Sequence, residues 1–142
     1  MIPYNELDSI NYDVNMAIRY RPDIEVHRRI DRWQTPEETM RLGTGDCEDY
    51  AILKAWRLAQ LGHSVDDMRI VVVRVGDSKS LHAALYCDSQ YDKGFLWWKK
   101  RNVPCTYILD NMTDNLYRPD QVRHTVINIY RAERFFDAAN RV

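Results

Sequence analysis

The sequence has little of what marks a secreted, membrane-spanning or nucleic-acid-binding protein. Its 142 residues include three cysteines, an odd and sparse set that predicts free thiols rather than a disulfide framework. No apolar run approaches the ~20 residues that a membrane-spanning helix needs, and the first residues lack the basic start and apolar stretch of an export signal. The formal net charge is -1, so no global positive field attracts phosphates. These absences predict a cytoplasmic protein with no nucleic-acid partner and no membrane span.

The chain is expected to form one domain, residues 1–142. Hydrophobic residues make up 45% of it, and a chain of this length buries roughly two thirds of its unfolded surface in a single core. No internal repeat, low-complexity tract or linker divides it.

Helical signals dominate the first half of the chain. An apolar stripe at three-to-four spacing predicts an amphipathic helix over about residues 4–19. Thr35 followed by Pro36 is typical of a capped helix start, and that short helix is expected to end by Gly43. A third and strongest pattern predicts the main helix over about residues 47–61.

Extended signals dominate the second half. Residues 68–75 are β-branched and almost continuously apolar, as in a strand that is buried on both faces. Further strands are expected at 81–87, 95–98, 106–109 and 125–132, with turns at 88–90 and 102–104. Because short turns join antiparallel neighbours, the whole predicts an α+β fold in which helices precede a meandering sheet.

Cys47 is the first candidate for chemistry, since it lies where a glycine-containing loop runs into the main helix. The positive end of the helix dipole and the unpaired N–H groups there favour a thiolate, with pKa values of ~3.5–7.5 at such sites. The alternative is a buried structural cysteine, which is what most free cysteines are. A nucleophilic role requires a base within reach.

Four histidines can supply that base. His63 follows the far end of the main helix, ~20 Å from Cys47 at 1.5 Å per residue, and is excluded. His27 and His124 are expected to face solvent. His82 lies at the start of a predicted strand whose other residues are apolar, and a polar ring is unusual there. It is therefore the candidate base, and the alternative is a structural histidine that is hydrogen-bonded within the core.

A third polar group would orient the imidazole. Asp110 and Asn111 follow an apolar strand, and either can accept a hydrogen bond from His82, although such a pair alone is typical of a turn. The order Cys47, His82, Asp110 predicts a nucleophile on a helix with its base and orienting acid on successive strands.

Several segments together resemble the bacterial transglutaminase-like cysteine proteinases, the family of LapG-type proteases. They are Trp33-Gln34-Thr35-Pro36, Gly43-Thr44-Gly45-Asp46-Cys47-Glu48-Asp49-Tyr50-Ala51, Leu61-Gly62, His82-Ala83 and Leu109-Asp110-Asn111. The resemblance spans about residues 10–131. It implies a papain-like (transglutaminase-like) fold, with the nucleophile at the start of a central helix packed on an antiparallel sheet, and a Cys47-His82-Asp110 triad.

The resemblance also implies Ca²⁺ binding by Asp46 and Glu48, which flank the nucleophile. Calcium takes six to eight oxygen ligands, so two side chains alone do not complete a site. Equally, these carboxylates can cap the helix and complement its dipole. For the oxyanion, the backbone N–H of Cys47 is the first donor expected, and Trp33 or Gln34 lies upstream where related folds place a second.

The sequence therefore predicts a cysteine endopeptidase that hydrolyses a peptide bond in a protein substrate. The same acyl-enzyme can instead serve an acyltransferase or transglutaminase, and a calcium-responsive binding module without turnover is the alternative outside enzymes. Relatives that act on surface adhesins are periplasmic, whereas this sequence shows no export signal. The segment 88–105 is long for the family and carries aromatic residues that can line a substrate groove or join the core.

Overall fold

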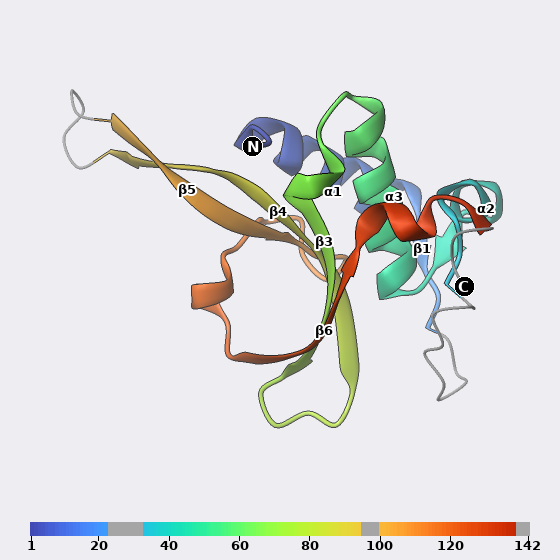
Figure 1. The fold of residues 1–142 in the computed structure, drawn as a ribbon. Helices are drawn as coiled ribbons and strands as arrows, with labels where there is room; N and C mark the ends of the chain where they lie inside the picture. Colours follow the sequence, from blue (N-terminus) through green and yellow to red (C-terminus); the bar gives the residue numbers. More distant parts are fainter. Residues whose placement is uncertain (23–32, 95–99, 139–142) are drawn as a thin grey trace.

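Helices precede an antiparallel sheet in the computed structural model, which describes residues 1–22, 33–94 and 100–138, with backbone alone at 91–94 and 100–102 (Figure 1). The helices are α1 (Tyr4–Ala17), α2 (Pro36–Leu42) and α3 (Cys47–Gln60). The strands β3 (Met68–Val75), β4 (Leu81–Gly94), β5 (Lys100–Leu109) and β6 (His124–Arg131) form one sheet in the order β5-β4-β3-β6. The predicted α+β fold is confirmed.

Short elements connect these layers. β1 (Arg19–Tyr20) pairs in parallel with β2 (Thr44–Gly45), which joins the end of α1 to the segment before α3. The 3-10 turns are η2 (Val65–Asp67), η3 (Pro119–Gln121) and η4 (Ala132–Phe135). No helix among the described residues is long and apolar enough to cross a membrane.

The helix boundaries predicted at Thr35 and Gly43 are confirmed, and capping interactions set them. The Thr35 side chain accepts a hydrogen bond from the backbone N–H of Glu38, and α2 ends at Gly43, whose φ of 69° is left-handed. At the start of α3, Asp46 is the N-cap and pairs with Asp49 in a capping box. These caps fix where α3 begins, and hence where Cys47 lies.

The sheet is covered on both faces, as predicted for residues 68–75. On one face, Ile70 and Val72 of β3 belong to the main core with α3; on the other, Val71 and Val73 pack with a smaller cluster that includes Tyr117. Figure 1 shows α3 along one face and the chain after β5 crossing the other. β4, which carries His82, and the end of β5, which Asp110 follows, are therefore packed from two sides.

The expected turns at 88–90 and 102–104 are wrong. Both segments lie inside one long hairpin, in which β4 and β5 pair continuously from Leu85↔Leu109 to Gly94↔Lys100. Pro104 is tolerated because β5 is an edge strand, where a missing N–H costs little. The predicted strand 95–98, which holds most of the aromatic residues of this segment, lies outside the described residues.

Candidate active site

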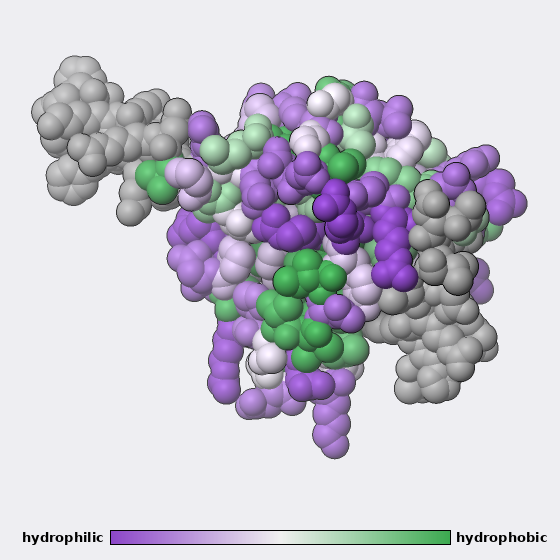
Figure 2. All heavy atoms as spheres, in the orientation of Figure 1, coloured by the Kyte–Doolittle hydropathy of each residue, from purple (hydrophilic) through white to green (hydrophobic). Residues whose placement is uncertain are grey.

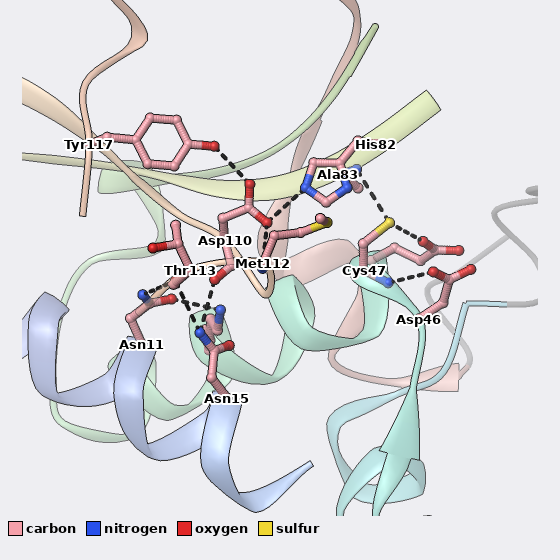
Figure 3. Close-up of polar contacts among 12 residues, drawn as sticks. Asn11, Asn15, Asp46, Cys47, His82, Ala83, Asp110, Met112, Thr113 and Tyr117 are labelled. Carbon is pink, nitrogen blue, oxygen red and sulfur yellow. Dashed lines mark hydrogen bonds and ion pairs between the residues drawn. The ribbon is translucent and has the colours of Figure 1, made fainter. Parts of the chain in front are cut away.

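Cys47 is the first residue of α3 and is buried, with its sulfur among polar groups (Figure 3). The thiol donates to Oε2 of Glu48 at 3.0 Å, and the backbone N–H of Ala83 donates to Sγ at 3.4 Å. The backbone N–H of Cys47 itself donates to Oδ1 of Asp46 at 2.7 Å. The sulfur therefore lies between one donor, the Ala83 N–H of β4, and one acceptor, the Glu48 carboxylate, at the N-terminus of α3.

Gly45 permits this arrangement by its lack of a side chain. A Cβ at residue 45 would lie 2.7 Å from Cβ of Asp49, which is closer than real Cβ atoms approach. Asp49 accepts hydrogen bonds from the backbone N–H groups of Asp46 and Gln34. Burial raises the pKa of Asp49 to about 7, against these two hydrogen bonds, which favour the carboxylate. Asp49 thus joins the loop to the start of α3 at the position of Cys47.

His82 and Asp110 meet at the far side of the same site. Nε2 of His82, near the start of β4, lies 2.8 Å from Oδ1 of Asp110, which directly follows β5. An ionised carboxylate only accepts hydrogen bonds, so Nε2 is the donor in this contact and Nδ1 is the nitrogen that Asp110 leaves unengaged. Figure 3 shows the imidazole between the Asp110 carboxylate and the sulfur of Cys47. Of the two acceptors expected, it is Asp110 and not Asn111 that contacts His82.

Asp110 is held by two further donors. The backbone N–H of Met112 donates to Oδ1 at 3.0 Å, and the hydroxyl of Tyr117 donates to Oδ2 at 2.7 Å. Burial alone would raise the pKa of Asp110, but the hydrogen bonds from His82, Met112 and Tyr117 hold it below its ordinary value. Asp110 therefore stays ionised and can stabilise a charged imidazolium.

Sequence reasoning missed Tyr117. It lies in an irregular segment, where a tyrosine carries no periodic or motif signal. Its backbone bridges Ile108 of β5, and this pairing turns the phenol back toward Asp110. Burial and the neighbouring Asp110 charge raise the pKa of Tyr117, which keeps its hydroxyl protonated as a donor.

Asp46 and Glu48, the predicted calcium ligands, are both buried beside the sulfur. With Cys47 they form a group whose possible ligand atoms lie within 4.8 Å of one another. Carboxylate oxygens suit a hard cation such as Ca²⁺, whereas the sulfur does not. The capping role that the sequence also allowed for Asp46 is present as well.

Trp33 and Gln34, predicted to contact substrate or oxyanion, have different surroundings. Trp33 is buried against Tyr130 and Phe135 and lines a cavity of about 150 Å³ with Glu48 and other residues. The Gln34 amide donates to Oδ2 of Asp49 at 3.0 Å, so its side chain helps to fix the start of α3.

The cavity lies at the helix-facing side of the sheet, next to the exposed edge strand β6. Its wall includes Ala83, the residue whose N–H reaches the Cys47 sulfur, and Ile127 of β6. Figure 2 shows an apolar patch where Figure 1 places β6. Exposed apolar side chains of that strand are Val126, Ile127 and Ile129. Of these three, Ile127 lines the cavity, so apolar surface adjoins the wall that Glu48 and Ala83 share.

The remaining histidines lie elsewhere, and one expectation about them is wrong. His124 is half-buried rather than solvent-facing, because Tyr86 contacts its Nε2 at 3.2 Å and the carbonyl of Val122 contacts its Nδ1 at 3.1 Å. His63 pairs with Glu6 at the far end of α3. His27 lies outside the described residues.

All three cysteines are free thiols, as predicted. Burial raises the pKa of Cys87, which lies within the sheet, and it also raises that of Cys105 on β5. Both thiols are therefore disfavoured as nucleophiles at neutral pH.

Residues 3–132 match the model of one protein family, the bacterial transglutaminase-like cysteine proteinases (BTLCP). The chain belongs to this family. As a BTLCP member, the protein is a cysteine peptidase with a transglutaminase-like fold, which confirms the family and the enzyme class predicted from sequence. No curated protein matches the chain.

Solved structures of Legionella pneumophila LapG are similar in fold. Three of them, one calcium-bound and one treated with EGTA, align with a TM-score of 0.65 and 23% sequence identity. The alignments cover 91% of this chain and 67–68% of the LapG chains. At this identity the likeness establishes the architecture of the BTLCP chain, and residue roles have to be argued from its own contacts.

Proposed function

We propose that this BTLCP peptidase hydrolyses a peptide bond within a protein substrate, with Cys47 as nucleophile, His82 as base and Asp110 as the acid that orients the base. The observation that carries the proposal is the 2.8 Å contact between Nε2 of His82 and Asp110, with the ring on the side of the Cys47 sulfur (Figure 3). Because Nε2 is engaged, Nδ1 is the nitrogen left to exchange a proton with the thiol.

The reaction then follows from the positions of these atoms. Nδ1 of His82 takes the thiol proton, and the thiolate of Cys47 attacks the substrate carbonyl to form a tetrahedral intermediate. His82 returns that proton to the leaving amine as the C–N bond breaks, which leaves an acyl-enzyme. Water, deprotonated by His82, attacks the acyl group; the C–S bond then breaks, the carboxylic acid product departs, and the proton passes from His82 to the sulfur of Cys47. Asp110 stabilises the imidazolium at each proton transfer.

For the oxyanion we propose the backbone N–H of Cys47 as the first donor. It donates to Asp46 in the absence of substrate, so the oxyanion would replace a carboxylate as its acceptor. The contribution of Trp33 or Gln34 stays a prediction; the place of Trp33 in the cavity wall supports it better than the Asp49-bound amide of Gln34 does.

We further propose that Asp46 and Glu48 hold Ca²⁺, with backbone carbonyls and water completing the coordination. Two observations support this: the buried carboxylates lie close together, and one of the similar LapG structures is calcium-bound. Bound calcium would supply positive charge beside the sulfur. Glu48 repels a thiolate at Cys47, and pairing its charge with a cation would remove that repulsion.

The experiment that tests this function uses Cys47→Ala as a substrate trap. Proteins captured by the variant are incubated with wild-type enzyme, and new N-termini are located by mass spectrometry. We expect wild type to create one or a few new N-termini and the Cys47→Ala and His82→Ala variants to create none. Release of ammonia with incorporation of an added amine would instead establish acyl transfer. Cleavage by Cys47→Ala would overturn the assignment.

A further inference from the structure

The turn that follows β5 is fastened to α1 by two asparagines. Asn11 and Asn15 lie one helical turn apart and so on the same face of α1. The side-chain amide of Asn15 donates to the carbonyls of Asp110 and Thr113 at 3.0 and 3.2 Å. The Asn11 amide donates to the carbonyls of Thr113 and Asp114 at 3.1 and 3.2 Å (Figure 3). The backbone of Asp110 is thereby tied to a helix about a hundred residues away in sequence.

Lys54 joins this contact to the helix that carries the nucleophile. Its side chain is fully buried, and Nζ donates to Oδ1 of Asn11 at 2.7 Å. Lys54 follows Cys47 by seven residues, so both lie on nearly the same face of α3. Its hydrogen bond uses the amide oxygen of Asn11 and fixes the amide nitrogen toward the turn. One chain of contacts thus runs from α3 through α1 to Asp110.

A buried lysine is costly to a fold unless its ammonium group is hydrogen-bonded, and here the side-chain oxygen of Asn11 accepts that hydrogen bond. Burial lowers the pKa of Lys54 to about 7, and the negative charges of Asp110 and Asp114 act in the opposite direction. An apolar residue would satisfy packing at this position without that cost. An apolar residue could not donate a hydrogen bond to Asn11, whose amide in turn binds the carbonyls of the 110–114 turn.

We propose that Asn11, Asn15 and Lys54 are positioning residues, which set the carboxylate of Asp110 relative to His82 by holding the 110–114 turn between α1 and α3. The inference rests on the proposed function, because a positioning role for these residues presupposes that Asp110 is the acid of the triad. It goes beyond the triad in assigning a catalytic purpose to three polar side chains that contact neither His82 nor Cys47 in any described interaction.

The test compares Asn15→Ala and Lys54→Met with two matched controls. Asp13→Ala removes an exposed side chain from α1, and Leu58→Ala removes buried apolar atoms from α3, one helical turn after Lys54. Two readouts are followed well below each melting temperature. One is the rate at which iodoacetamide alkylates Cys47 at pH 6, and the other is hydrogen exchange of the Met112 amide, whose N–H donates to Asp110.

We expect Asn15→Ala and Lys54→Met to slow alkylation by about 10- to 100-fold, the cost of a misplaced catalytic group, and to speed Met112 exchange. Both controls should leave these two rates near the wild-type values, even where Leu58→Ala lowers the melting temperature more. Wild-type alkylation in Asn15→Ala would overturn the inference, whether or not Lys54→Met folds. If wild-type Cys47 is itself unreactive, the proposed function fails, whereas the Met112 exchange rate still reports whether the turn is held.

Discussion

Nε2 of His82 and Oδ1 of Asp110 lie 2.8 Å apart, and the second carboxylate oxygen accepts a hydrogen bond from Tyr117. This relationship fixes the tautomer of His82, since an ionised carboxylate can accept but not donate. It also sets the direction of the ring, because a carboxylate held at both oxygens cannot rotate freely. In the proposed mechanism, the reactivity of Cys47 therefore depends on the contacts of Asp110, on the opposite side of the imidazole.

Asp110→Asn should separate the orienting role from simple packing. The amide has nearly the same shape, but it can donate to Nε2 and stabilise the wrong tautomer, so cleavage of the trapped substrate should fall about 10²- to 10⁴-fold. Asn111→Ala is the matched control and should keep most of the activity. Wild-type turnover in Asp110→Asn, with a loss in Asn111→Ala, would transfer the orienting role to Asn111.

Tyr117→Phe removes one hydrogen bond from Asp110 and leaves the ring in place. The pKa of Asp110 should rise, because a donor that favours the carboxylate is lost, and kcat should fall about tenfold, equivalent to a hydrogen bond worth roughly 1.4 kcal/mol. Carbon-13 NMR titration of the carboxyl measures the pKa directly. Tyr86→Phe, which removes a hydroxyl bound to His124, is the control. An unchanged Asp110 titration in Tyr117→Phe would show that the phenol is irrelevant.

The same variant changes how stability depends on pH. The folded pKa of Asp110 lies below its unfolded value, so the group stabilises the fold above the unfolded pKa and loses this contribution as pH falls through the folded pKa. Because Tyr117→Phe raises the pKa of Asp110 in the folded protein, it brings that pKa closer to the value in the unfolded protein. The variant should therefore lose more stability at neutral pH than at strongly acidic pH, as urea unfolding would measure.

Gly45→Ala should disturb the site through the backbone. The added methyl would lie 2.7 Å from Cβ of Asp49, and relieving that overlap must shift the loop or the first turn of α3. We expect a loss of about 1–3 kcal/mol in unfolding free energy, together with slower cleavage, because Cys47 lies in that turn. Thr44→Ala, one residue earlier, is the control. A Gly45→Ala variant as stable as wild type would contradict the close approach.

Calcium binding by Asp46 and Glu48 should appear as a shift in melting temperature. A ligand at 100 times its Kd adds about 2.7 kcal/mol, so CaCl₂ should raise the melting temperature and EGTA should reverse the rise. Glu48→Gln and Asp46→Asn should both lose this response, although asparagine retains the capping function. Glu37→Gln on the exposed side of α2 should keep it. Identical melting of wild type in CaCl₂ and EGTA would refute the calcium site.

The parts of the fold that were predictable have local causes. Thr35 and Gly43 bound α2 because capping and left-handed glycine are properties of single residues, and the apolar stripes of α1 and α3 need only helical periodicity. The fold class followed from the order of these segments. The contact between His82 and Asp110 agrees with one of the two acceptors expected for the imidazole, whereas the roles of Cys47, His82 and Asp110 stay predictions.

The errors have a long-range cause. Residues 88–90 have turn chemistry, but pairing with 104–106 on the partner strand outweighs that local preference and extends the hairpin. Tyr117 and Asn11 were missed because their partners lie across the fold, where no spacing in the sequence connects them. Lys54 did leave a signal, since it is the one lysine on the apolar face of the main helix that includes Tyr50, Ala51 and Leu58.

The central claim is that Cys47 is activated by His82, and its selective alkylation tests this most directly. At pH 6, iodoacetamide should label Cys47 in the wild-type protein far faster than Cys87 or Cys105, whose pKa values are raised by burial, as peptide mass spectrometry would measure. His82→Ala should remove this selectivity. Labelling of Cys47 no faster than that of Cys105, or equally fast in wild type and His82→Ala, would contradict the account.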